Sequence, residues 1–176
     1  KNTIDQVARL GLDALEPLLT MVSKSSAAGQ ENAARAIARL VPAMSGEQRD
    51  RTITALRARL AAERLPMGYR RQTMVSNTVA AALVAALCEL DASAATSEIQ
   101  AALFVDAVGQ VILDHWQRTH ALWLLDALAQ GIQSPNISLK ALNIVRRMSP
   151  DDAVLRRFLP LVEAIMQSET DASALI

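Results

Sequence analysis

The sequence predicts an all-α protein, and three observations support this. Alanine, leucine, arginine, glutamine and glutamate, which are good helix formers, dominate the 176 residues. Apolar residues recur at steps of three and four along the chain, which is the period of an amphipathic helix. Short alternating runs of β-branched and aromatic residues, which are typical of strands, are nearly absent. We expect about seven or eight helices with short connections.

The composition excludes several classes of protein. Apolar residues make up 51% of the chain and charged residues 20%, and the formal net charge is zero, so the chain is not of the disordered class. The length fits one all-helical domain, 1–176, and the missing initiator methionine leads us to expect a fragment of a longer protein. The amino terminus lacks the apolar stretch of a signal peptide.

The single cysteine and the longest uncharged run bear on compartment and burial. Cys88 has no partner for an internal disulfide, so we expect an intracellular location, in the cytoplasm or nucleus. The run from Gln72 to Cys88 is shorter than the roughly 20 apolar residues that a membrane span needs, and its first half is polar. Val79 to Leu90 is apolar on nearly every side, which predicts a helix covered by its neighbours and no membrane segment.

The first helices are bounded by polar and glycine signals. Thr3 with Gln6 forms a capping box that opens a short helix, which Gly11 ends. Leucines at helical spacing predict the next helix over Leu12 to Val22. The polar stretch Ser23 to Gly29 predicts a loop.

Two longer helices follow. Alanine, isoleucine and leucine at helical spacing predict a helix over Gln30 to Met44. Ser45 with Gln48 forms a second capping box, which opens a helix that ends near Arg64. After a loop that contains proline and glycine, Tyr69 to Leu90 is predicted as one long helix.

The second half of the chain is predicted as four more helices. Apolar spacing predicts one helix over Ser97 to His115 and another over Trp116 to Gln130, which Gly131 closes at the position after the helix. Ser134-Pro135 and Ser149-Pro150 each place a capping residue before a proline at the first helical position, so each opens a further helix.

Similar features near the two ends indicate a repeat. Pro17 and Pro160 each lie within an apolar helical run, where an interior proline costs about 3 kcal/mol unless the helix bends. Finding this twice in the same setting predicts a built-in bend. Asn32 to Leu40 and Ser138 to Arg146 are also alike, because both carry small residues where a neighbouring helix comes close.

Leu15 to Val41 resembles a repeat of the HEAT or armadillo type. It shows a first helix with a proline, a short polar stretch and an alanine-rich second helix. The resemblance implies antiparallel helix pairs stacked as a right-handed solenoid, in three or four units of roughly 36 to 48 residues. Tyr69 to Leu90 departs from the pattern because it is too long. A closed helical bundle of the same helices is the alternative.

The resemblance also implies a function class. HEAT and armadillo proteins mostly act as scaffolds, so it implies a non-enzymatic protein that binds a protein partner on one face of its second helices. Such arrays have apolar end faces, which we expect to contact further repeats or another copy of the chain. The end-face candidates are Ile4, Val7, Leu10, Leu161, Ile165 and Met166.

Arginine is concentrated in one segment and near the carboxyl end. Between Arg49 and Arg71 arginines outnumber acids seven to two, whereas from Gln72 to Val145 acids outnumber basic residues six to two. Arginine suits two-pronged contact with a carboxylate or a phosphate, so we interpret seven arginines as binding an acidic protein partner. They are Arg49, Arg57, Arg64, Arg70, Arg71, Arg146 and Arg147.

Two other interpretations of the arginines stay open. The phosphate backbone of a nucleic acid suits the same residues, but Tyr69 is the one aromatic residue near them, so base stacking is not favoured. The arginines are also typical of a solvated helix face that pairs with nearby acids, such as Glu47, Asp50 and Asp151.

The densest polar cluster contains Asp114, His115 and His120. An enzyme that uses these three residues is a lesser alternative for the function. The histidines are five residues apart, whereas a helical zinc pair needs a spacing of four, so a junction between helices is the plainer interpretation. Cys88 has no histidine near it in the sequence and is interpreted as a small buried hydrophobe. We expect no metal and no cofactor.

Overall fold

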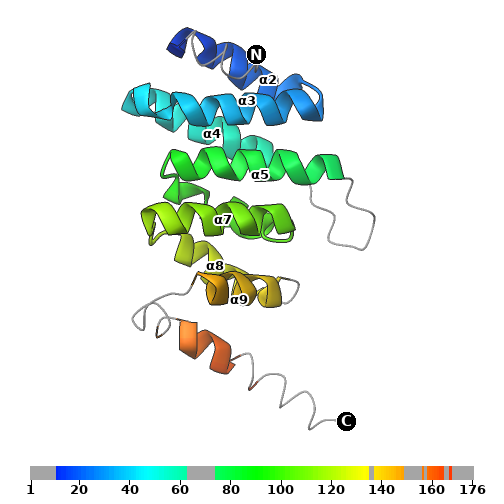
Figure 1. Ribbon diagram of the computed structural model, residues 1–176, viewed down its shortest axis with the longest axis vertical. Coiled ribbons are helices and arrows are strands. Elements are labelled where there is room, and N and C mark those ends of the chain that lie inside the picture. Colours follow the sequence, from blue (N-terminus) through cyan, green and yellow to red (C-terminus); the bar gives the residue numbers. More distant parts are fainter. Residues whose placement is uncertain are drawn as a thin grey trace.

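The computed structural model describes residues 11–62, 74–134, 137–148, 156, 158–164 and 167. Within these residues the secondary structure is helical, with no strand, so the predicted all-α class is confirmed. The helices follow one another along the longest axis of the molecule, from α2 near one end to α9 and the helical residues 158–164 near the other (Figure 1).

The first helix pair is joined by a much shorter connection than predicted. Helix α2 (Leu15–Lys24) and helix α3 (Ala27–Leu40) are separated by two serines, so the predicted loop Ser23 to Gly29 is wrong. The reason is that Ser26 caps α3: its hydroxyl accepts a hydrogen bond from the backbone N–H of Gly29 at 3.4 Å. The polar stretch therefore ends α2 at Lys24, supplies the two connecting serines and opens α3 at Ala27.

Pro17 does not bend the middle of a helix. A 3₁₀ turn, η1 (Gly11–Ala14), precedes α2, and Pro17 is the third residue of α2. The first backbone N–H groups of a helix have no intrahelical acceptor, so a proline there removes no hydrogen bond. Pro17 therefore lies in the first turn of α2 and not in its interior, and Pro160 lies within helical residues 158–164.

The second helix pair begins where the sequence predicts. Helix α4 (Gly46–Ala62) follows the capping box, in which Ser45 N–H donates to Gln48 Oε1 at 2.9 Å and Gln48 N–H donates to Ser45 Oγ at 3.3 Å. Its partner is helix α5 (Met74–Glu89). Of the predicted long helix Tyr69 to Leu90, residues 69–73 lie outside the described residues.

The predicted helix Ser97 to His115 is two helices. A short 3₁₀ turn, η3 (Ser93–Ala95), leads into α6 (Thr96–Ala102), and α7 (Asp106–Thr119) follows after three apolar residues. Leu103 and Val105 in this turn are buried. The break contains neither glycine nor proline, so no local signal marks it; it forms because burial of its side chains favours the turn.

The start of the next predicted helix, at Trp116, is also wrong. Helix α7 continues through Trp116 and ends at Thr119, because His120 adopts the left-handed conformation with φ 52°. Helix α8 (Leu124–Ile132) and helix α9 (Ser138–Arg147) complete the described pairs. Helix α9 thus begins later than the predicted start at Ser134; Pro135 and the predicted Ser149-Pro150 start lie outside the described residues.

Gly131 lies inside α8 and does not cap it, so the predicted role is wrong. A Cβ atom at this position would come within 2.7 Å of Leu103 Cδ1 and 3.1 Å of Ala141 Cβ. The glycine therefore allows α8 to approach both α9 and the turn that follows α6. Close packing, rather than backbone conformation, explains this residue.

The helices form two rows. The first row is α2, α4, α6 and α8, and the second row is α3, α5, α7 and α9; within each row every helix packs against the next. The labels α3, α5, α7 and α9 follow one another down the stack in Figure 1. The pairs begin at Leu15, Gly46, Thr96 and Leu124, so no constant repeat length marks them in the sequence.

The hydrophobic core runs between the two rows and includes much of α5. The helix buries side chains around most of its circumference, including Val79, Leu83 and Leu87, as its sequence predicts. It packs against α3, α4 and α7. Across the described ranges, no helix is long and apolar enough to span a membrane.

Candidate functional site

The structure places the predicted arginines in different settings. Arg64, Arg70 and Arg71 lie outside the described residues. Arg49, Arg57, Arg146 and Arg147 are described and lie on α4 and α9. Their contacts decide which of them are available to a partner. Of the end-face candidates, Leu161 is described and half-buried, and the side chains of the other five are not described.

Arg49 stabilises the end of the preceding helix. Its Nη2 donates to the carbonyl oxygen of Val41 at 3.0 Å, and its Nε donates to that of Met44 at 3.4 Å. These carbonyls lie in and just after η2 (Val41–Ala43), the 3₁₀ turn that ends α3. Because the last carbonyls of a helix lack intrahelical donors, a cation stabilises them.

Arg57 joins two helices of the first row. Its Nε and Nη2 both lie 2.9 Å from Glu98 Oε1, so α4 is bound to α6. The other oxygen, Glu98 Oε2, is buried and has no hydrogen-bond partner within the described part of the chain. The partner of Arg57 is thus a distant glutamate and not one of the nearby acids that the sequence suggests.

The two arginines near the end of α9 differ. Arg147 Nη2 donates to Gln110 Oε1 on α7 at 3.0 Å. Arg146 is exposed and makes no hydrogen bond or ion pair with the residues that the structure describes. Arg146 is therefore the described arginine among the predicted set that is most available to a partner.

Basic side chains link neighbouring helices throughout the stack. Arg51 of α4 makes a two-pronged contact with Glu16 of α2, at 2.8 and 2.9 Å. Lys140 Nζ of α9 lies 2.8 Å from Asp106 Oδ1 and 2.6 Å from the carbonyl oxygen of Phe104. Partners such as Glu16 and Glu98 could not be found from the sequence, because they are 35 and 41 positions away from their arginines.

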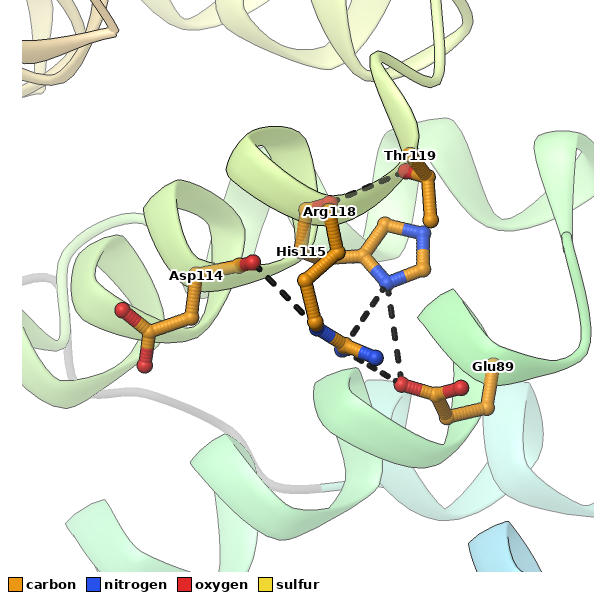
Figure 2. A network of polar contacts seen from close by, with 5 residues as sticks. All are labelled: Glu89, Asp114, His115, Arg118 and Thr119. Atoms are coloured by element: carbon orange, nitrogen blue, oxygen red, sulfur yellow. Dashed lines mark hydrogen bonds and ion pairs between the residues drawn. The ribbon is translucent and has the colours of Figure 1, made fainter.

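The structure does not bring Asp114, His115 and His120 together. The Asp114 carboxylate accepts a hydrogen bond from Gln110 Nε2 at 2.6 Å and points away from the His115 ring (Figure 2). His120 is exposed, and its ring centroid lies 5.4 Å from that of Trp116. Among the three residues the structure shows no side-chain hydrogen bond, so this geometry does not support an acid–base site.

His115 instead belongs to a cluster with Arg118 and Glu89, which we call the α5–α7 cluster. Arg118 Nη2 lies 2.6 Å from Glu89 Oε1 and 3.4 Å from His115 Nδ1, and Nδ1 lies 3.7 Å from the same Glu89 oxygen. Figure 2 shows the three side chains converging between the two helices. Glu89, at the end of α5, is the member that the sequence does not reveal.

Within the α5–α7 cluster His115 is neutral near pH 7, because its pKa is lowered. Burial of the ring is the main cause that lowers the pKa of His115 below 6.5; Arg118 acts in the same direction and Glu89 opposes it. Because arginine only donates hydrogen bonds, Nδ1 accepts from Arg118 and the proton resides on Nε2. The neutral imidazole is thus an acceptor in this cluster.

Cys88, the neighbour of Glu89, is chemically inert in this setting. Burial is the main cause that raises the pKa of its thiol to about 12, so the nucleophilic thiolate is not populated near neutral pH. Within the described residues, no group of three or more His, Cys, Asp or Glu side chains is arranged to hold a metal ion. The buried thiol therefore packs as an apolar side chain.

Comparisons with protein-family models, with curated proteins and with solved structures found no match. The functional assignment therefore rests on the contacts of this chain.

Proposed function

We propose that the chain is a non-enzymatic protein-interaction scaffold of the HEAT or armadillo type, built as a right-handed solenoid. The observation that supports this most is the continuous second row, in which α3, α5, α7 and α9 each pack against the next. The extensive contacts among the described helices join neighbours in a row or partners in a pair. A closed bundle would instead bring helices from opposite ends of the chain together.

The outward side of the second row is the surface that we propose for the partner. Helix α3 exposes Asn32 and Arg35 there, and α7 exposes Gln110 and Asp114. Between them, α5 carries the short side chains Thr78, Ala81 and Ala85, which are exposed or half-buried. Polar side chains on both sides give specificity, and short side chains let the partner come close to α5.

The chemistry of the partner is suggested by the α9 end of this surface. Arg146 is exposed and makes no contact within the described residues, so it offers a complete set of donors. We propose that an acidic side chain of the partner pairs with it. Arg49, Arg57 and Arg147 are already bound within the chain and contribute to the stack.

The test is affinity capture from source lysate with two matched variants. The first, Asn32→Glu with Asn143→Glu, places acidic side chains, which repel an acidic partner, on α3 and α9 of the second row. The control, Ala58→Glu with Ala101→Glu, places them on α4 and α6 of the first row, and all four positions are exposed. We expect a protein partner that survives nuclease treatment, with recovery reduced about tenfold by the first variant and unchanged by the control.

Two outcomes would contradict this proposal. If only the first-row control loses the partner, the binding surface lies on the first row and not on the second row that we propose. Recovery that collapses with nuclease would favour the alternative, a phosphate backbone bound through Arg146, which the exposure of that residue also permits. Binding to phosphates weakens steeply with added salt, so a salt series on the captured complex separates the two.

A further inference from the structure

The α5–α7 cluster has one acceptor oxygen that faces two nitrogen groups. Glu89 Oε1 lies 2.6 Å from Arg118 Nη2 and 3.7 Å from His115 Nδ1 (Figure 2). Arg118 always carries its charge, whereas the imidazole changes from acceptor to donor when it gains a proton. The arrangement thus has two ways to use the same carboxylate oxygen.

In the neutral state Arg118 satisfies both neighbours. Its Nη2 lies between Glu89 Oε1 and His115 Nδ1, at 2.6 and 3.4 Å. A proton on Nδ1 removes this acceptor and places a cation 3.4 Å from the guanidinium. The two cations then compete for Glu89. His115 is held in place by burial, whereas the side chain of Arg118 is 59% exposed, and its other hydrogen bond, from Nε to the Asp114 carbonyl oxygen at 3.4 Å, lies within α7.

The groups around the ring act in both directions. Burial is the largest effect and opposes the charged imidazole; Glu89, and to a smaller extent Asp91 in the turn after α5, favour it, and Arg118 opposes it. The Cys88 thiol on α5 stays protonated. On α7, the Asp114 carboxylate is held by Gln110, which also accepts from Arg147 of α9. Glu89 is therefore the anion best placed to receive the new proton donor.

We propose that protonation of His115 transfers Glu89 from Arg118 to the imidazolium and releases the Arg118 guanidinium from the joint between α5 and α7. The joint would then respond to mild acid, and the released arginine would add a cation to the outward side of the second row. This proposal concerns the joint itself and does not depend on the partner that the scaffold binds.

The test follows side-chain resonances by nuclear magnetic resonance from about pH 8 to about pH 5, the range in which histidines titrate. We expect the imidazole of His115 to titrate below the ordinary histidine value of 6.5, because burial lowers its pKa. We expect the Arg118 Nε–H resonance to move with the midpoint of His115. An Arg118 resonance that stays constant while His115 titrates would overturn the proposal.

Three variants make the assignment specific. His115→Gln is expected to abolish the movement of the Arg118 resonance, and His120→Gln, which removes the other histidine, is expected to leave it unchanged. Movement that persists in His115→Gln contradicts the proposal. Glu89→Gln alters a partly exposed residue and keeps the test valid if His115→Gln fails to fold. It is expected to lower the midpoint of His115 further and to suppress the exchange, because the carboxylate that both cations share is gone.

Discussion

Each of the two rows contains an arginine–glutamate ion pair that joins two of its helices, but the two pairs lie in different surroundings. In the first row Arg57 meets Glu98, with side chains 37% and 17% exposed; in the second row Arg118 meets Glu89, with side chains 59% and 36% exposed. The first pair lies partly within the protein, and water screens it less. The second is open to water and shares its carboxylate oxygen with a histidine.

This difference shows that the residue types alone do not decide how an arginine–glutamate pair contributes to the fold; its surroundings do. Around Arg57, partial burial makes the loss of one partner costly, because Glu98 Oε2 already has no partner among the described residues. Around Arg118, solvent limits the stabilisation, but the neighbouring imidazole makes the pair sensitive to protons. We therefore expect the first pair to stabilise the stack and the second to adjust it.

The largest effect is expected from removal of the first-row pair. Arg57→Met keeps the apolar stem of the side chain but leaves the Glu98 carboxylate partly buried without its cation, which should cost about 2 kcal/mol of unfolding free energy. For a chain of this size that corresponds to a fall in Tm of roughly 4–8 °C, measurable by circular dichroism. A matched Glu98→Gln variant and the double variant give the coupling energy between the two residues. A coupling energy near zero would show that the pair does not stabilise the fold despite its partial burial.

A smaller effect is expected when the second-row pair is removed at neutral pH. Arg118→Met should cost less than about 1 kcal/mol, because exposed ion pairs contribute little. The same denaturation experiment, with both variants in one buffer, measures the ratio of the two losses. Equal losses in the two rows would remove the distinction drawn from their exposure.

The capped and strongly apolar elements of this fold could be predicted from the sequence. The Ser45–Gln48 capping box starts α4, and the run of apolar residues in α5 is buried, because both signals are local. The break between α6 and α7 could not be predicted, since it depends on burial of Leu103 and Val105 by distant parts of the chain. The end of α7 at His120 is also not marked, because a histidine seldom takes the left-handed conformation.

Of the candidate site, too, one part could be predicted from the sequence and another part could not. The sequence singles out His115 and its neighbours as a polar junction between two consecutive helices, but His115 lies inside α7 and meets Glu89 of α5. The sequence does not reveal Glu89, because the glutamate lies 29 positions before Arg118 and becomes its neighbour only when the two helices pack together. Periodicity predicts which face of a helix is buried but not which residue of another helix meets it.

The smallest effect that we expect is a pH dependence of the Tm, which His115 causes in the second row and which the first-row pair lacks. Burial lowers the pKa of His115 in the folded chain below its unfolded value of 6.5, so the unfolded chain takes up the proton first as the pH falls. Unfolding is thereby favoured, and the contribution of neutral His115 to stability, fully present above pH 6.5, is lost as the pH falls from 6.5 toward the folded pKa. We expect the Tm of the unaltered chain to fall more across this window than that of His115→Gln, whereas Arg57→Met should follow the pH dependence of the unaltered chain with a constant offset. His120→Gln is the matched control, since it removes the exposed histidine and leaves the α5–α7 cluster intact. A His115→Gln variant whose Tm falls as steeply as that of the unaltered chain would place the proton-sensitive group elsewhere and make the two joints equivalent.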